Sequence, residues 1–380
     1  MRYRKFGSLD YDVSVLGFGA MRLPTIGKDS SHVDEPEAIK MIRHAIDHGV
    51  NYIDTAYVYH DKQGETAVGR ALENGYREKV KLATKLPPWL VETPDDFDRL
   101  LDEQLEKLQT DKIDFYLLHA LNATYWPKLR DWEVLNWAEG AIADGRIQYL
   151  GFSFHDDLEV FKDIVDAYDR WTFCQIQYNF MDIEYQAGTK GLQYAAHKGL
   201  AVVIMEPLRG GQLTNKVPKS VAELWQTATA RRTPADWALQ WIWNHPEVSV
   251  ILSGMSTMQH VIENLDSADH SATGILSKEE LILIDKVREE YRRLVPVACT
   301  NCKYCMPCPN GVEIAAIFEY YNDAIIYDNP ATPRFLYRNL SKDKQADSCV
   351  ECFECEEKCP QGIPISEDLK EAHARLGKKK

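Results

Sequence analysis

The chain has 380 residues, 45 % of them hydrophobic, so it is long enough for one large barrel followed by a small module. Its 58 acidic side chains outnumber the 44 basic ones, and the net charge of −14 argues against nucleic-acid binding, which needs a basic face. The basic N-terminus is not followed by an apolar run, and no apolar stretch approaches the ~18 residues of a membrane span, so we expect a cytoplasmic protein with no signal peptide and no membrane partner.

Short, mostly apolar runs alternate with helical patterns along the first three quarters of the chain, as is typical of strands buried on both faces of a parallel sheet. The predicted strands cover residues 13–19, 51–56, 80–85, 113–119, 147–153, 173–178, 201–205 and 249–253. The predicted helices include 36–47, 65–73, 132–144, 158–167 and 234–243, and Thr93 is the predicted N-cap of another. Eight strand–helix units favour a (β/α)8 TIM barrel over a doubly wound sheet. The first strand is not followed by the G-x-G-x-x-G pattern of a Rossmann domain.

A further helix is predicted at 278–293, and the cysteine-rich part of the chain begins just after it, at Pro296. We therefore predict a barrel over residues 1–295 and a small, mainly helical ferredoxin-like iron–sulfur module over residues 296–380. The module contains an internal repeat, because Cys308-Pro-Asn-Gly-Val-Glu-Ile314 echoes Cys359-Pro-Gln-Gly-Ile-Pro-Ile365. Each copy is expected to open onto an equivalent turn and then a helix.

Eight of the nine cysteines lie in two clusters within this module. A C-x2-C-x2-C run followed closely by Cys-Pro is the ligand pattern of [4Fe–4S] clusters, so two such clusters are predicted, with zinc as the alternative. In two-cluster ferredoxins the fourth cysteine of each motif binds the other cluster. By that rule one cluster takes Cys299, Cys302, Cys305 and Cys359, and the other takes Cys349, Cys352, Cys355 and Cys308. The first motif departs from the pattern by ending C-x2-C-P, and the ninth cysteine, Cys174, is predicted to be a buried core thiol.

Polar side chains stand at the ends of three successive predicted strands of the barrel. Asp54 and Tyr59 follow the second strand, Lys85 ends the third and His119 ends the fourth. A single buried histidine or a Lys–Asp pair is often structural, but chemistry in a (β/α)8 barrel sits at this rim. The combination at successive strand ends therefore predicts a catalytic site.

The Asp54-x4-Tyr59 spacing, Thr84-Lys85 and Leu118-His119 resemble the catalytic tetrad of the aldo-keto reductase superfamily, over about residues 1–295. With the cysteine-rich tail, the chain resembles the ferredoxin-fused branch of that superfamily. The resemblance implies that Tyr59 is the acid/base in the interconversion of a carbonyl and an alcohol on a small molecule. Because a free Tyr has a pKa of ~10, Lys85, held by Asp54, is expected to lower the pKa of Tyr59. His119 is expected to orient the carbonyl oxygen.

The resemblance also implies a nicotinamide cofactor along the later strand ends. Met205 takes the place of an aromatic residue that stacks on the ring, and Glu206 puts an unusual acid nearby. The Lys and Arg that many members use for the 2′-phosphate are absent, so NADH, NADPH and a flavin all stay open as the hydride carrier. The implied contacts are Met21, Ser153, Gln175, Met205, Pro207, Leu208, Arg209, Gly210, Gly254, Ser256, Glu263 and Asn264.

The clusters either transfer electrons or hold the module together. Hydride transfer moves two electrons and each cluster passes one, so a flavin or a radical-forming substrate would be needed between them. The leading hypothesis is an oxidoreductase whose clusters couple the barrel to an external electron carrier. The alternatives are a lyase or dehydratase assisted by electron transfer, a reductase with structural clusters, and an electron-transfer protein whose barrel docks a partner. Tyr125 and Trp126 form either an aromatic wall over the site or a packed loop.

Overall fold

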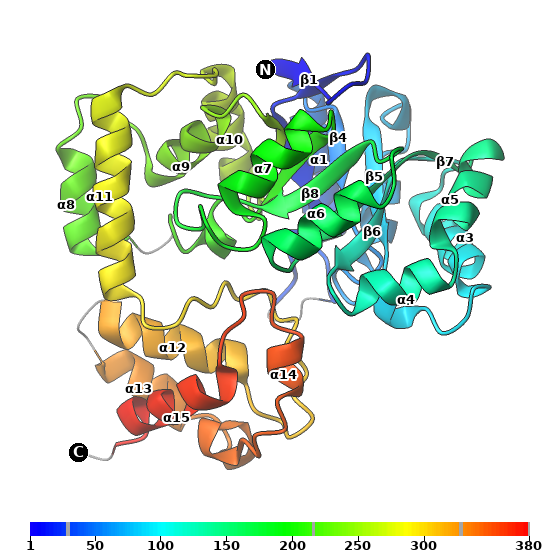
Figure 1. Cartoon of the computed structure of the whole chain (residues 1–380). Coiled ribbons are helices and arrows are strands. Elements are labelled where there is room, and N and C mark those ends of the chain that lie inside the picture. Colours follow the sequence, from blue (N-terminus) through cyan, green and yellow to red (C-terminus); the bar gives the residue numbers. More distant parts are fainter. Residues whose placement is uncertain (28–30, 215–216, 327–329, 379–380) are drawn as a thin grey trace. The chain divides into compact units, whose positions relative to one another are not determined.

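The computed structural model describes residues 1–27, 31–214, 217–326 and 330–378 (Figure 1). It divides into two compact units. The first comprises Met1–Pro207 and Asp236–Leu276, and the second comprises Leu208–Ala235 and Ser277–Lys380. The second unit thus takes in a segment that follows the seventh barrel strand as well as the cysteine-rich region. The boundary between residues 295 and 296 stays a prediction.

Eight parallel strands close into a barrel in the first unit, which confirms the predicted (β/α)8 fold. Each strand pairs with its neighbour along the chain, and the last pairs with the first through Ile251 and Leu16. The barrel strands are β3 (Leu16–Gly19), β4 (Tyr52–Asp54), β5 (Lys81–Leu86), β6 (Ile113–Leu121), β7 (Ile147–Phe154), β8 (Phe173–Gln177), β9 (Ala201–Met205) and β10 (Val248–Ser253). A hairpin of β1 (Tyr3–Lys5) and β2 (Asp12–Ser14) precedes them.

Aromatic side chains fill the barrel near the amino ends of its strands. Phe6, from the loop between β1 and β2, lies with its ring centroid 4.5 Å from that of Phe115 and 5.8 Å from that of Tyr52. These rings and Phe173 are fully buried. Because this end of the barrel is packed with apolar rings, the polar side chains at the opposite, carboxyl ends of the strands are left to form a site.

Local capping explains where several helices of the first unit begin. α1 follows Asp34, whose side chain accepts a hydrogen bond from the backbone nitrogen of Glu37 at 3.3 Å. The expected N-cap at Thr93 is not formed: α3 begins at Asp96, and the Asp96 carboxylate itself accepts hydrogen bonds from the backbone nitrogens of Glu92 and Thr93. The helices are α1 (Glu35–Asp47), α2 (Gly64–Ala71), α3 (Asp96–Leu108), α4 (Tyr125–Asp131), α5 (Val134–Ala143), α6 (Leu158–Asp166), α7 (Gly188–His197), α9 (Pro234–Trp243) and α10 (Met258–Asp269).

In the second unit, α8 (Lys219–Gln226) and α11 (Lys278–Leu294) lie side by side (Figure 1). A capping box between Ser277 and Glu280 starts α11. The rest of the unit is helical, with α12 (Ile314–Ile326), α13 (Ala331–Arg338), α14 (Glu354–Glu357) and α15 (Ile365–Leu376). In the part of the chain that the structure describes, no helix is both long and apolar enough to cross a membrane.

The internal repeat of the cysteine-rich region folds as two equivalent turns. Gly311 and Gly362 both have positive φ, at 81° and 59°, and the isoleucine that ends each copy begins a helix. These helices, α12 and α15, pack on each other around an apolar core that includes Phe318. The predicted pseudo-symmetry of this region is therefore seen in its backbone.

Candidate active site and iron–sulfur module

The Lys85 ammonium occupies the centre of the polar group at the barrel rim. Its Nζ donates hydrogen bonds to Asp54 Oδ1 at 2.6 Å, to the Thr55 carbonyl oxygen at 2.7 Å and to the Tyr59 hydroxyl at 3.4 Å. Lys85 is fully buried, and Asp54 is 2 % exposed. The parallel register places Asp54 beside Ala83, so the last residues of β4 and β5 bring the acid and the ammonium together.

Tyr59 lies in the turn between β4 and α2 and is 9 % exposed. A Cβ atom added to Gly64 would lie 3.0 Å from the Tyr59 Cβ, so the glycine lets the start of α2 approach this residue. The next residue, His60, has φ of 52°, and its Nε2 accepts a hydrogen bond from the Leu23 backbone nitrogen at 3.1 Å. The acid/base candidate is thus fixed by its own turn and by the segment after β3.

His119 completes the group, with its ring centroid 6.3 Å from that of Tyr59 in an edge-on arrangement. Trp89 lies 5.1 Å from His119, and Tyr125 lies 6.0 Å from Trp89, both measured between ring centroids. Trp126 is buried against Trp171 instead. Of the two predicted aromatic residues, Tyr125 therefore joins a wall beside His119, whereas Trp126 belongs to the packed core.

The sequence reasoning missed a buried polar network behind Lys85. The Thr84 hydroxyl donates to Glu65 Oε1 at 2.6 Å, and Gln104 Nε2 donates to the same oxygen at 2.8 Å and to the Lys85 carbonyl oxygen at 3.0 Å. Glu65, Thr84 and Gln104 are fully buried. A signal was present, because Gln104 stands among leucines on the apolar face of α3. The network fixes the backbone on which Lys85 is carried.

A second ion pair lies near Tyr59. Arg22, on the short helix η1 (Ala20–Arg22), has Nη2 3.7 Å from Glu206 Oε1, and the Glu206 side chain is 15 % exposed. Glu206 follows β9 with φ of 53°, and its carbonyl oxygen accepts a hydrogen bond from Asn179 Nδ2 at 3.0 Å. Glu206 raises the pKa of Tyr59 and Arg22 lowers it, so the unusual acid contributes to the electrostatics of this site.

Burial dominates the protonation of the tetrad. It raises the pKa of Tyr59 well above its ordinary value, with further increases from Asp54 and Glu206 and a decrease from Arg22, so the net lowering expected from Lys85 is not found. Burial, with the nearby Lys85 charge, holds the pKa of His119 well below its usual range. At neutral pH the site therefore presents a protonated phenol and a neutral imidazole.

Several predicted cofactor contacts come together on adjacent strand ends. Ser153 pairs with Gln175 across β7 and β8, and Gln175 Nε2 lies 3.5 Å from Met205 Sδ at the end of β9. The Ser153 hydroxyl accepts a hydrogen bond from the Ala120 backbone nitrogen at 2.7 Å, beside His119. Ser153, Gln175 and Met205 thus lie at the ends of neighbouring strands, close to the tetrad residue His119.

The remaining contacts of the first unit lie after β10 and on η1. Asn264 Nδ2 donates to the Ser253 hydroxyl at 2.7 Å and is buried, whereas Glu263 is exposed. A Cβ atom on Gly254 would lie 3.3 Å from the Arg22 side chain. Ser256 is exposed. Met21 is partly buried on η1. Pro207 is the last residue of Met1–Pro207, the first of the two segments that make up this unit.

Leu208, Arg209 and Gly210 belong to the second unit. Arg209 and Gly210 lie on the short helix η4 (Arg209–Gly211) and both have positive φ, at 46° and 64°. Just after them, Gln212 Nε2 donates a hydrogen bond to the Cys299 carbonyl oxygen. This part of the implied cofactor contacts therefore packs against the first cysteine motif, which the sequence did not indicate.

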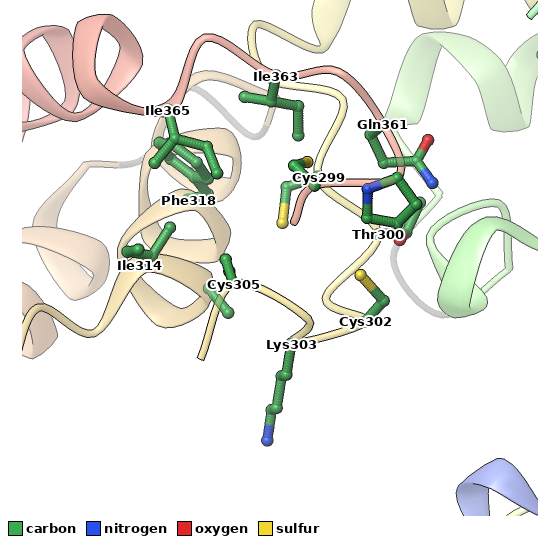
Figure 2. Close-up of a pocket in the computed structure, with 13 residues that line it drawn as sticks. Cys299, Thr300, Cys302, Lys303, Cys305, Ile314, Phe318, Gln361, Ile363 and Ile365 are labelled. Atoms are coloured by element: carbon green, nitrogen blue, oxygen red, sulfur yellow. The ribbon is translucent and has the colours of Figure 1, made fainter. Parts of the chain in front are cut away.

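A cavity in the second unit is lined by Cys299, Cys302, Cys305 and Cys359 (Figure 2). This is the set that crossed ligation predicts for one cluster. Ile314, Phe318, Ile363 and Ile365 form its apolar wall. The Asn301 backbone nitrogen donates to Cys299 Sγ at 3.4 Å. Four thiols with a backbone N–H donor in an apolar cavity fit the ligand set of an iron–sulfur cluster.

The second cysteine set is less enclosed. The thiols of Cys349 and Cys308 lie near enough to Cys355 to add to the effect of burial, which raises the pKa of Cys355 to about 11. Cys355 is buried and Cys352 is exposed. Cys174, in contrast, is fully buried on β8 and far from either motif in sequence, which agrees with its predicted role as a core thiol.

Comparison with known proteins identifies two families along the chain. Residues 15–289 match the aldo/keto reductase family, and residues 298–364 match a 4Fe–4S dicluster domain. An uncharacterised oxidoreductase YrpG of Bacillus subtilis is 27 % identical, over 76 % of this chain and 96 % of its own. Methylglyoxal reductase YeaE of Escherichia coli is 28 % identical, over 70 % of this chain and 92 % of its own.

Solved structures of aldo-keto reductases share the fold. The holo form of AKR11C1 from Bacillus halodurans has a TM-score of 0.64 at 25 % identity, covering 76 % of this chain and 96 % of that one. A Klebsiella pneumoniae aldo-keto reductase in complex with NADPH has a TM-score of 0.61 at 28 % identity, covering 74 % of this chain and 93 % of that one. The chain is therefore an oxidoreductase of the aldo/keto reductase family, with a 4Fe–4S dicluster domain after its barrel.

Proposed function

We propose that this reductase interconverts a carbonyl and an alcohol on a small molecule, with Tyr59 as the acid/base. The observation that carries the proposal is the buried chain from Asp54 through the Lys85 ammonium to the Tyr59 hydroxyl. When bound, a nicotinamide would supply the hydride, that is, both electrons of the reduction. Tyr59 supplies the proton, and its raised pKa keeps that proton available at neutral pH.

The neighbouring side chains would orient the carbonyl group. His119, neutral because its pKa is lowered by burial, would hydrogen-bond the carbonyl oxygen. Trp89 and Tyr125 would provide an apolar wall on one side of the substrate. Such a wall suits a substrate with a flat or apolar face.

For the hydride carrier we favour NADPH, because similar reductases have been solved with NADPH or NADP. Ser153 and Gln175 would hold the carboxamide, and Met205 would lie against the ring. Buried Asn264, with Glu263 beside it, would hold the adenine. NADH and a flavin are the alternatives, and binding titrations with each carrier distinguish them.

We further propose two [4Fe–4S] clusters with crossed ligation, acting in one-electron transfer with an external carrier in the cytoplasm. Four thiols line one cavity with apolar walls. Three of them come from one C-x2-C-x2-C run and the fourth from the Cys-Pro of the other motif, which is the ligand pattern of a [4Fe–4S] cluster, with zinc as the alternative. Because each cluster passes one electron, a flavin or a radical-forming substrate would have to link them to hydride chemistry.

The test is turnover by the anaerobically purified full chain with a panel of aldehydes and ketones. We expect alcohol formation matched one to one by nicotinamide oxidation. Product formed without nicotinamide oxidation would contradict the reductase and favour a lyase or dehydratase. Iron, sulfide, zinc and flavin analysis of the same sample tests the cluster assignment separately.

A further inference from the structure

The second cysteine motif exposes a short run of residues to solvent, which we call the Cys352 strip (residues 350–354). All eight candidate cluster ligands are described by the structure, and of these Cys352 alone is exposed. The two large apolar side chains beside it are also exposed, Val350 by 63 % and Phe353 by 49 %. The ligand nearest to solvent is thus bordered by apolar surface.

The strip is exposed although its module has a well-formed apolar core. Val312, Ile317 and Phe318 are buried there, and the cysteines of both motifs pack against the same core. Glu351 and Phe353 on either side of Cys352 have φ of 56° and 63°, as Asn301 and Lys303 have similar positive values beside Cys302, but of these two cysteines only Cys352 is exposed. Single exposed apolar residues are common, but here two of them lie within two residues of one candidate cluster ligand.

The surroundings of the strip are acidic. Residues 347–358 include five acidic residues and one lysine. Glu351 pairs with Lys370 at 2.8 Å and Glu354 pairs with Lys358 at 3.7 Å, and all four side chains are about half exposed. Exposed pairs of this kind are weak and leave the surface open to competing cations. A partner with a basic rim would therefore meet complementary charge here.

We propose that the Cys352 strip is the docking surface for a one-electron redox protein that carries basic side chains around an apolar edge of its redox centre. The proposal rests on the proposed function, in which the clusters are redox-active. One electron passes between the cluster held by Cys352 and the partner's centre, with no bond formed or broken and no proton moved. A small apolar patch with a charged rim suits a short-lived complex with fast, salt-dependent association.

The test uses the full chain with its clusters reduced by dithionite and the excess reductant removed. Stopped-flow mixing with oxidised cytochrome c, a basic one-electron acceptor, gives the rate constant for electron transfer. Two strip variants are compared, Val350→Ser/Glu351→Gln and Phe353→Asn, the latter because Asn tolerates positive φ. The control is Ile282→Ser/Glu289→Gln on α11, where Ile282 is 54 % exposed and Glu289 pairs with Arg292 at 3.0 Å.

We expect the rate constant at low salt to fall roughly tenfold in each strip variant and to stay near the wild-type value in the control. Reduction of ferricyanide, which needs no protein docking surface, should not fall in any of them. Unchanged cytochrome c rates in strip variants with intact cluster spectra would overturn the docking surface alone. If one strip variant loses iron, the cytochrome c rate of the other strip variant is the test of the docking surface.

Two further outcomes are decisive. A chain that contains no cluster reducible by dithionite would overturn the redox role in the proposed function, and this surface with it. A dimer that forms with rising concentration and is abolished by the strip substitutions would also overturn the proposal, because the strip would then be covered by a second copy of this chain.

Discussion

The barrel rim and the cysteine-rich module hold their functional side chains in different ways. At the rim, Asp54, Lys85 and His119 lie at the ends of barrel strands and are at most 2 % exposed, so strand register fixes them. In the module the candidate ligands lie in loops, except Cys355 on α14, and Cys352 reaches solvent. We infer that the rim is preorganised by the fold, whereas the module depends on its clusters to order its ligand loops.

Removing the Lys85 ammonium should cause the largest loss of both stability and activity at the barrel rim. Lys85→Met leaves the Asp54 carboxylate buried without its counter-ion, so the free energy of unfolding should fall by about 3–5 kcal/mol. Carbonyl reduction should fall roughly 10²–10⁴-fold, because Tyr59 loses the group that stabilises its deprotonated form. Denaturant unfolding and steady-state kinetics measure the two effects. The Asp54→Asn/Lys85→Met variant should regain stability without activity, and regained activity would contradict the account.

Removing one cluster ligand should affect the module and spare the rim. Cys302→Ala is expected to lose about half of the iron, or about four atoms per chain, since one of two [4Fe–4S] clusters cannot be held. The melting of the barrel should change little. Iron and sulfide analysis, with calorimetry, makes the comparison. The matched control is Cys174→Ala, which should keep all its iron, and full iron content in Cys302→Ala would show that this thiol is not a ligand.

The Arg22–Glu206 pair beside Tyr59 should set the pH range over which the barrel reduces carbonyls. Carbonyl reduction needs protonated Tyr59, so activity is present below its pKa and is lost as pH rises through it. Glu206 raises that pKa and Arg22 lowers it. Glu206→Gln should therefore move the alkaline loss of kcat to lower pH, and Arg22→Gln should move it to higher pH. Shifts in the same direction in both variants would rule out this electrostatic role.

The network behind Lys85 should give the smallest effect. Gln104→Leu removes the donor to Glu65 and to the Lys85 carbonyl oxygen, so the free energy of unfolding should fall by about 1–3 kcal/mol. Denaturant unfolding measures the change. The control is Gln259→Leu, because the Gln259 side chain donates to the exposed Glu263 at 2.8 Å, and this variant should stay within about 0.5 kcal/mol of wild type. An equal loss of unfolding free energy in both variants would show that the network behind Lys85 contributes no more to stability than an exposed hydrogen bond.

The sequence predicts the tetrad because each member directly follows an apolar run, and the parallel strands of a barrel end at one rim. It does not predict the Arg22–Glu206 pair, because those residues are far apart along the chain and meet only when β3 and β9 are placed in the barrel. The predicted cap at Thr93 is wrong because α3 begins at Asp96, three residues later. Local patterns thus indicate elements and their ends, while side-chain partners depend on tertiary structure.

The Tyr59→Phe variant tests the central claim, that the rim carries out acid–base chemistry on a carbonyl. The substitution removes one hydroxyl and keeps the ring, so cofactor affinity and iron content should stay near wild type. Carbonyl reduction with a nicotinamide should fall at least about 100-fold, measured as kcat at saturating cofactor. Full turnover by Tyr59→Phe, with unchanged cofactor binding, would contradict the account.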